Sequence, residues 1–215
     1  MRAFAKRSMR SRAASVGSRA GRTLLSLATA AALLGTVVAS LIATRATAAD
    51  DHTPRAASQA IFLQMTPVFL SPRCLNCHTR AAFPRQGDDR HRHTMNVARG
   101  PHDRGAAGLH CNTCHQAANQ TASGVPGAPD WHLAPLRMAW DGLTPGELCR
   151  ALSDPKHGAM KPTELAAHFN TGLVRWAWAP GTDAEGRKRT TPPIAHDSFV
   201  ALTKRWVASG GACPN

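Results

Sequence analysis

Two copies of the pattern C-x-x-C-H constrain this chain more than any other feature. Residues 74–78 read CLNCH and residues 111–115 read CNTCH. Cysteines three positions apart lie on one face of a helical turn, so both thiols can reach the two vinyl groups of one porphyrin and form thioethers. The histidine that follows can reach the iron as its proximal ligand. The pattern therefore predicts two covalent c-type haems, with thioethers at Cys74, Cys77, Cys111 and Cys114 and proximal ligands His78 and His115.

Two other kinds of site use C-x-x-C pairs. Zinc ribbons separate their pairs by about 15–20 residues, whereas 33 residues lie between Cys77 and Cys111. Zinc also gives no reason for a histidine directly after both pairs. A thioredoxin-type centre needs a βαβ pattern around the motif, and no such pattern is visible. The sequence favours haem over both alternatives.

The first 48 residues have the composition of a secretory signal peptide. Residues 1–22 carry seven basic side chains and no acid, residues 23–44 are uncharged, and Ala46-Thr47-Ala48 matches a cleavage site. The alternative is a retained membrane anchor, because the uncharged run is longer than usual. We therefore expect a leader at 1–48, one dihaem domain at 49–215, and a periplasmic location, membrane-anchored only if the leader is retained.

Much of the chain's positive charge lies in the predicted leader, which export would remove. The whole chain has a net charge of +13, but residues 1–48 hold eight Lys and Arg and no acid. The remainder has 18 basic and 13 acidic residues, a net charge of +5. This excess gives no support for nucleic-acid binding. A mildly basic surface can instead steer an acidic redox partner.

The rest of the chain predicts short helices separated by long loops. The expected fold is mainly α with much irregular loop, a single domain wrapped around two covalent haems. Thr144 and Glu147 form a capping box that opens a helix, and Pro67 should end or kink an earlier one. We expect helices at 56–65, 145–153, 162–169 and 197–208, the last capped by Asp197, and loops at 79–110, 116–130 and 181–193.

A low-spin haem needs a second axial ligand, histidine or methionine. The 79–110 connector supplies His93 and Met95 as first choices, with His91 next. A second supply is the segment from Trp131 to Trp140, where His132 ranks above Met138. The alternatives are a solvated, histidine-rich loop and a packed loop in which methionine fills gaps.

The two remaining cysteines, Cys149 and Cys213, predict a disulfide, because an even remainder in an exported chain usually pairs. Trp176 and Trp178 flank one alanine and should point to different sides of the chain. One of them is a candidate to line a haem edge, and the alternative is packing in the core.

With these residues in view, the chain resembles a family of small exported dihaem cytochromes that are often labelled as subunits of isoquinoline 1-oxidoreductase. The resemblance covers nearly all of 49–215 and implies His93 and His132 as the distal ligands, in preference to Met95. The label implies a molybdenum hydroxylase as the partner. The matching segments are 71–78, 86–93, 111–115, 131–140, 148–149, 154–155, 176–178 and 212–214.

These observations predict an electron-transfer protein rather than an enzyme. Each iron would cycle between ferric and ferrous states and exchange single electrons with a redox protein, such as a molybdenum hydroxylase or another dehydrogenase. The alternative is a dihaem peroxidase-like enzyme in which one iron keeps an open position. The sequence has no evident arginine and glutamate arrangement for cleaving peroxide.

Overall fold

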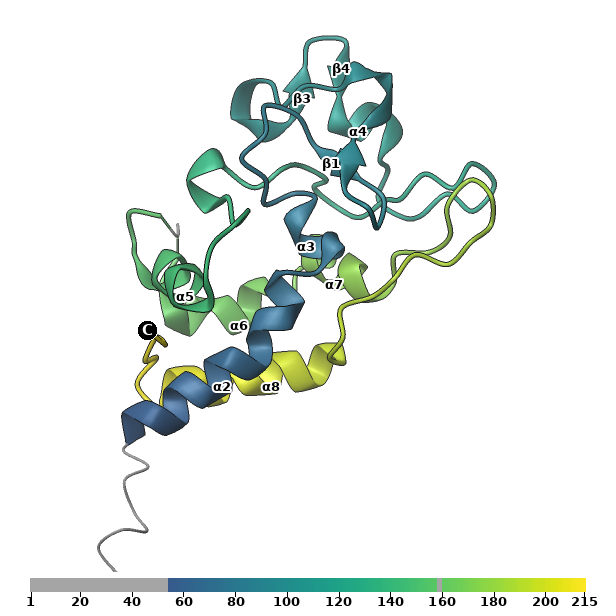
Figure 1. Ribbon diagram of the computed structural model, residues 1–215. Helices are drawn as coiled ribbons and strands as arrows, with labels where there is room; N and C mark the ends of the chain where they lie inside the picture. The colour runs from purple at the N-terminus through teal and green to yellow at the C-terminus, as the bar shows by residue number, and fades with distance from the viewer. Residues whose placement is uncertain (1–53, 158–159) are drawn as a thin grey trace, which may run out of the picture. The chain divides into compact units, whose positions relative to one another are not determined.

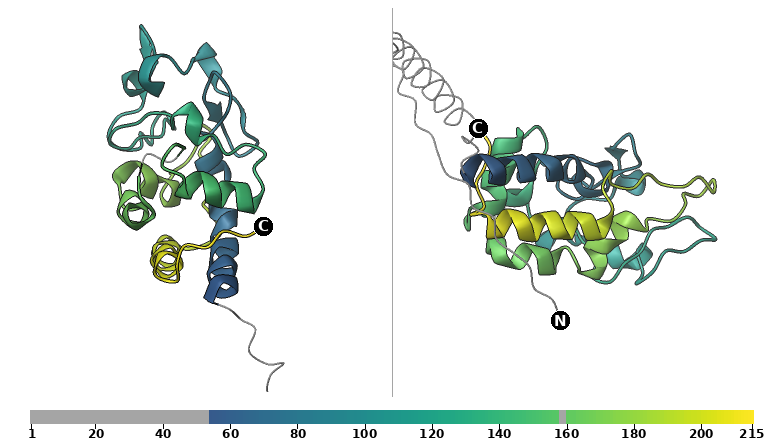
Figure 2. Two further views of the ribbon diagram at one scale, coloured as in Figure 1. Left: turned by 90° about the vertical axis from the view of Figure 1, so that its left-hand side faces the viewer. Right: turned by 90° about the horizontal axis from the view of Figure 1, so that it is seen from below.

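Helices α2 (Pro54–Phe69) and α8 (His196–Ala208) lie side by side and form the base of the fold (Figures 1 and 2). The computed structural model describes residues 54–157 and 160–215, which fall within a single compact unit, His52–Asn215. The expected leader at 1–48 lies outside the described residues. No helix among the described residues has both the length and the hydropathy to cross a bilayer.

The remaining helices and strands are short and are joined by long loops. The fold is therefore mainly helical with much irregular loop, as predicted. Two antiparallel sheets of two strands each lie in the connector between the two motifs, and the sequence did not predict them. The helices are α3 (Pro72–Leu75), α4 (Cys111–Cys114), α5 (Pro145–Ser153), α6 (Leu165–His168) and α7 (Gly172–Arg175). The strands are β1 (Arg85–Gln86), β2 (His91–Arg92), β3 (Gly105–Ala106) and β4 (Leu109–His110). Single 3₁₀ turns lie at Thr94–Asn96, Pro101–Asp103, Leu136–Met138, Pro162–Glu164 and Trp176–Trp178.

The core is a cluster of aromatic side chains between α2 and α8. Phe62 of α2 packs against Trp206 of α8, with ring centroids 5.3 Å apart. Phe69, at the end of α2, lies 5.3 Å from Phe199 and, edge-on, 5.5 Å from Trp140. All five side chains are buried, and burying a side chain such as Phe contributes about 1.5–3 kcal/mol. Through Trp140 this core reaches the first C-x-x-C-H motif.

One predicted helix start is confirmed, the predicted cap of α8 is wrong, and the earlier helix does not end at Pro67. Glu147 donates its backbone N–H to the Thr144 hydroxyl at 3.3 Å and accepts the Thr144 N–H at 2.8 Å, which completes the capping box. Helix α2 continues past Pro67 to Phe69, since a proline in the last turn removes few helical hydrogen bonds. Asp197 is not the cap of α8; it lies in the first turn, where a carboxylate interacts favourably with the helix dipole.

The C-terminal tail is fastened to two helices. The predicted disulfide between Cys149 and Cys213 is present and joins the tail to α5. Gln59 of α2 donates its side-chain amide to the Cys213 carbonyl at 2.8 Å. The backbone N–H of Ala212 donates to the hydroxyl of Ser58, also on α2, at 2.9 Å. The tail therefore closes the core beside the start of α2.

The connector between the two motifs folds back on itself between β3 and β4, and a glycine in β3 lets the two strands approach closely. Gly105 has a φ of +91°, and a β-carbon there would lie 2.3 Å from the Leu109 carbonyl oxygen. Only glycine fits such a close approach with a positive φ. The turn sets β3 against β4 and leads directly into α4, which holds the second motif. The connector therefore positions the second pair of cysteines.

Removing the disulfide should lower the stability of the protein without changing its fold. The bond joins residues 64 positions apart, and closing a loop of that length contributes roughly 4 kcal/mol in the chain-entropy model. We expect the Cys149→Ala, Cys213→Ala double variant to lose up to that amount in a denaturant titration. Wild-type protein with this bond selectively reduced should match it. Equal unfolding midpoints for the variant and the oxidised wild type would contradict the prediction.

Candidate functional site

The first motif is built on one helical turn. Helix α3 begins at Pro72, a residue favoured at the first helical position. The N–H groups of Cys77 and His78 both donate to the Cys74 carbonyl, at 3.1 and 2.9 Å. Both thiols are free of a disulfide. The turn therefore presents two thiols and an imidazole from five consecutive residues.

The second motif repeats this construction. Cys111 and Cys114 are the first and last residues of α4, and the N–H of His115 donates to the Cys111 carbonyl at 3.0 Å. Its thiols are also free, and that of Cys114 is exposed. The two motifs thus share one local geometry although they lie in different surroundings.

The His78 ring is held on two sides. Its Nδ1 lies 2.8 Å from the carbonyl oxygen of Met138, and because a carbonyl can only accept, the Nδ1–H of His78 donates. Trp140 stacks on the ring with centroids 3.4 Å apart and planes 10° from parallel. The same tryptophan donates its backbone N–H to the His78 carbonyl at 3.0 Å. This tautomer leaves Nε2 with its lone pair free.

His115 is held in the same way by different residues. Its Nδ1 donates to the Pro126 carbonyl at 2.7 Å. Trp131 stacks on its ring with centroids 4.5 Å apart and planes 4° from parallel. Histidines that bind metals almost always donate their second ring N–H to a carbonyl, a carboxylate or water, which fixes the tautomer and the ring orientation. Both motif histidines have this arrangement.

The pKa values of both rings favour the neutral form. Desolvation by the surrounding protein lowers the pKa of His78 to about 4, although its hydrogen bond to Met138 raises it. Desolvation also lowers the pKa of His115, against an opposing effect of the Pro126 carbonyl. Only neutral imidazole binds a metal. At neutral pH both rings are therefore ready to act as ligands.

The thiols of the first motif are kept protonated. Desolvation raises the pKa of Cys74 to about 11 and that of Cys77 to about 12, although both keep part of their surface accessible. Reactive C-x-x-C centres show the opposite shift, because a lowered pKa supplies the thiolate. This electrostatic environment does not suit thiol–disulfide exchange. In residues 54–157 and 160–215, no group of three or more His, Cys, Asp or Glu side chains is arranged to hold a metal ion.

A cavity of about 820 Å³ lies beside the second motif and reaches the first. Its volume falls in the range of about 300–1,000 Å³ that is usual for small-molecule and cofactor sites. The wall includes Cys77 of the first motif and Trp131 and Trp176 from the later loops. Trp178, two residues on, packs against the core instead, so the two tryptophans point to different sides as predicted. The second-motif residues in the wall are Cys111, Cys114 and His115.

His93 lies opposite His115 across part of this cavity. The two ring centroids are 5.9 Å apart, with planes at 75°. His93 bonds through Nδ1 to the Thr94 carbonyl at 2.7 Å, so its Nε2 is also free. Metal–imidazole bonds of about 2 Å place the centroids of two opposed histidine ligands roughly 6 Å apart. The separation of the two rings would allow His93 and His115 to hold one metal ion together.

The other four distal candidates are placed less favourably. His91 and Met95 also line the cavity, but His91 bonds to Asp89 at 2.6 Å and Met95 is 69% exposed. His132 lines the cavity next to Trp131. The Met138 carbonyl lies at Nδ1 of His78, the nitrogen opposite the one that would face a metal. In the described part of the chain, His93 alone of the five makes ring contact with a motif histidine.

Sequence reasoning missed one histidine near the first motif. His168, the last residue of α6, lies close enough to His78 for its charge to contribute to lowering the pKa of His78, after desolvation. Desolvation lowers the pKa of His168 too, and His132 lowers it further. The sequence around His168 carries no motif that links it to the first C-x-x-C-H. Only tertiary structure places it within electrostatic range of both other rings.

Four buried N–H donors find no hydrogen-bond partner among the described residues. Three are arginine Nε atoms and the fourth is the indole nitrogen of the tryptophan stacked on His78; they belong to Arg73, Arg85, Arg90 and Trp140. A buried donor without a partner costs about 1–3 kcal/mol, so native proteins rarely keep several together. The first motif lies among these donors. A porphyrin, which carries two carboxylates, supplies the acceptors that such donors need, and the residues present fit this group.

Comparison of the chain with family models, curated proteins and solved structures finds no match. The family resemblance inferred from the motifs therefore remains a prediction. The function has to be argued from the two motifs and the cavity themselves.

The thiols should differ in their rate of alkylation in haem-free, reduced protein. At pH 8, a thiol with a pKa of about 12 is ionised in about one molecule in ten thousand, against roughly a quarter for an unperturbed cysteine. Because the thiolate is the nucleophile, we expect iodoacetamide to modify Cys77 at least a hundredfold more slowly than the exposed Cys114. Peptide mass spectrometry over time measures both rates. Similar rates at the two positions would contradict the electrostatic description.

Proposed function

We propose that this protein is an exported dihaem c-type cytochrome that carries single electrons between redox proteins. One observation carries the proposal: both C-x-x-C-H histidines are desolvated, donate Nδ1–H to a backbone carbonyl, stack on a tryptophan and leave Nε2 free. Metal-binding histidines need a hydrogen bond of this kind at the second ring nitrogen, because it fixes the tautomer and the ring orientation.

The chain would hold the two haems through six motif residues. Cys74 and Cys77 would attach one porphyrin and Cys111 and Cys114 the other, with His78 and His115 as proximal ligands. Haem, when bound, supplies an iron that takes one electron from a donor and returns one to an acceptor. His93 is the distal ligand that best fits His115. His168 is the histidine whose charge reaches His78 of the first motif, and His132 lines the cavity beside the second.

The protein's own contribution is orientation and exclusion of water. Each carbonyl fixes the imidazole tautomer and makes the ring a better ligand. Trp140 is buried and packs on Phe69 of the core, so it prevents the His78 ring from turning. Trp131 restrains the His115 ring, with Trp176 edge-on behind it at 4.8 Å.

The partner and the location follow from the sequence. A leader at 1–48 supports a periplasmic protein, anchored to the membrane only if that segment is retained. The resemblance to dihaem cytochromes supports a molybdenum hydroxylase or another dehydrogenase as the electron donor. The chain would then pass electrons on to a second redox protein.

A dihaem peroxidase-like enzyme is the second candidate, and one observation favours it. Among the described residues, the ring contact of His78 is with Trp140 and with no second histidine, whereas the ring of His115 contacts His93. An iron bound by His78 alone on one side would keep a position open for substrate. Exposure of the purified protein to carbon monoxide separates the two functions, because an electron carrier with two six-coordinate haems gives no change in its ferrous spectrum.

The haem content tests the proposal directly. We expect the chain, produced with haem-attachment machinery, to show a mass increase equal to two porphyrins and two c-type haems by pyridine haemochrome. Replacing Cys114 and His115 together should leave one haem. A wild-type mass without any porphyrin would refute the proposed function, and a single haem would restrict it to one motif.

The distal role of His93 has its own test. We expect His93→Ala to convert one of the two haems from low-spin to high-spin, seen as loss of about half of the low-spin electron paramagnetic resonance signal. The matched control is His91→Ala, in the same connector, whose ring is exposed and bonded to Asp89. Both haems should stay low-spin in the control. An unchanged spectrum for His93→Ala would assign the sixth ligand elsewhere.

A further inference from the structure

Arg73 is a charged side chain buried where a charge is costly. It directly precedes Cys74 in α3, yet its side chain is only 3% exposed and lines the cavity beside the second motif. Its guanidinium carbon lies 5.9 Å from the ring centroid of Trp176, which also lines the cavity. Burial lowers the pKa of Arg73 even though Asp88 raises it. Arg73 thus directly precedes the first motif in the sequence, whereas its side chain lies in the wall of the cavity beside the second motif.

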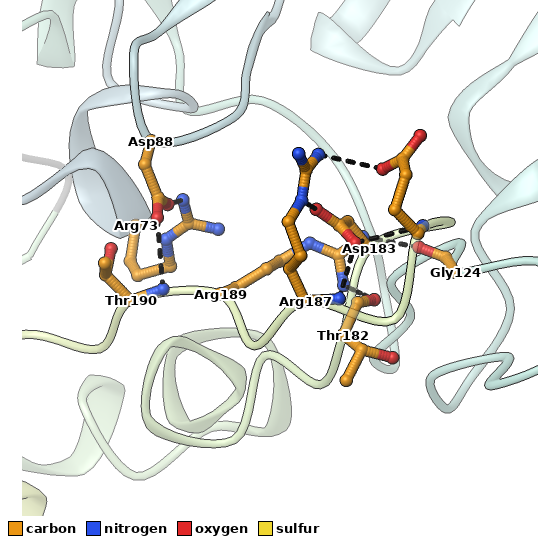
Figure 3. Close-up of polar contacts among 9 residues, drawn as sticks. Arg73, Asp88, Gly124, Thr182, Asp183, Arg187, Arg189 and Thr190 are labelled. Atoms are coloured by element: carbon orange, nitrogen blue, oxygen red, sulfur yellow. Dashed lines mark hydrogen bonds and ion pairs between the residues drawn. The ribbon is translucent and has the colours of Figure 1, made fainter.

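The hydrogen bonds of Arg73 are incomplete. Its Nη2 pairs with a carboxylate oxygen of Asp88, and the other oxygen of Asp88 accepts the Thr190 backbone N–H at 3.3 Å (Figure 3). The Nε of Arg73 is buried and has no partner among the described residues. An arginine fork matches a carboxylate with two parallel N–H groups. One donor of this fork, the Nε–H, is therefore free for a second acceptor.

A second arginine adds positive charge to the same wall. Arg189 donates to the backbone carbonyls of Thr182 and Gly124 (Figure 3) and to that of Pro180, none of which carries charge. Burial lowers the pKa of Arg189, and repulsion from Arg73 lowers it further. The neighbouring Asp183 is engaged by Arg187, whose Nε donates to it at 2.7 Å.

We propose that Arg73, assisted by Arg189, forms an anion site in the cavity wall that binds a carboxylate of the cofactor. This inference rests on the proposed function and identifies the carboxylate as a haem propionate. The site gives the propionate a partner that is shielded from water, and it gives Arg73 the second acceptor that it lacks. Arg73 is in this sense a positioning residue, because it acts on the iron through the propionate and through its charge.

The sign of the effect on the iron follows from electrostatics. A fixed positive charge beside the iron disfavours the ferric state, which carries one more positive charge than the ferrous state. Loss of Arg73 removes that charge and also leaves the propionate uncompensated. Both changes stabilise the ferric state and lower the midpoint potential of the nearer haem.

The test compares three variants of the site and one control variant, all haem-loaded, by spectroelectrochemical titration. We expect Arg73→Gln to change the redox equilibrium constant of one haem by about tenfold, a fall of ~59 mV, and Arg73→Lys to give a smaller fall. Asp88→Asn removes the opposing negative charge, so it should raise the potential of the same haem. A purely structural role for Arg73 would not predict opposite signs. Arg205→Gln, an equal charge change at an exposed position on α8, should leave both potentials in place.

Each outcome decides a separate question. Wild-type protein without covalent haem would refute the proposed function itself. Haem-loaded Arg73→Gln with both potentials unchanged, or shifted only as much as in Arg205→Gln, would overturn the anion site alone. If Arg73→Gln fails to accumulate, Arg73→Lys and Asp88→Asn still decide, because their shifts must have opposite signs. If the potential of Arg73→Gln falls only when an acidic partner protein is added, the carboxylate that binds Arg73 belongs to that partner. This result would also overturn the proposal.

Discussion

The hydrogen bond from a histidine Nδ1–H to a backbone carbonyl is the interaction on which the rest of the site depends. It occurs twice, between His78 and Met138 and between His115 and Pro126. Each acceptor comes from a segment far beyond the motif or from the loop that follows it, so the local turn alone cannot orient the imidazole. The tertiary structure must place a backbone carbonyl next to each ring, and in this chain the long loops carry those carbonyls.

The two histidines receive that support from different parts of the fold. Trp140 stacks on His78 and is itself wedged against Phe69, in the aromatic core formed by α2 and α8. Trp131 stacks on His115 and rests on Trp176, which belongs to a short turn after α7. The disulfide and the tail hydrogen bonds stabilise the first support by holding α5 and α2 together. The second depends on loops, whose contacts are mainly polar.

Much of this organisation could be predicted from the sequence, because the signals are local. The capping box at Thr144, the cysteine pair of the disulfide and the opposed orientations of Trp176 and Trp178 all follow from neighbouring residues or from counting. The acceptor carbonyls, the approach of His168 to His78 and the burial of Arg73 could not be predicted. Every residue has a backbone carbonyl, so the sequence does not show which one will accept a hydrogen bond. The sequence also does not distinguish the buried Arg73 from the exposed arginines of the chain. Helix α2 continued past Pro67 because packing against α8 outweighs the loss of a terminal hydrogen bond.

The unequal supports imply that the two irons of a dihaem protein would have unequal potentials. Water withdrawn from a site disfavours the more highly charged ferric state, so burial raises a haem potential. The His78 ring is stacked on the buried Trp140 and its pKa is lowered to about 4, whereas His115 lies beside the exposed Cys114. Solvation alone would therefore place the higher potential at the first motif and the easier access at the second. The positive charge of Arg73, which lines the cavity between the two motifs, would set how large that difference becomes. An electron that enters at the exposed second centre would then move on to the first with a favourable change in free energy.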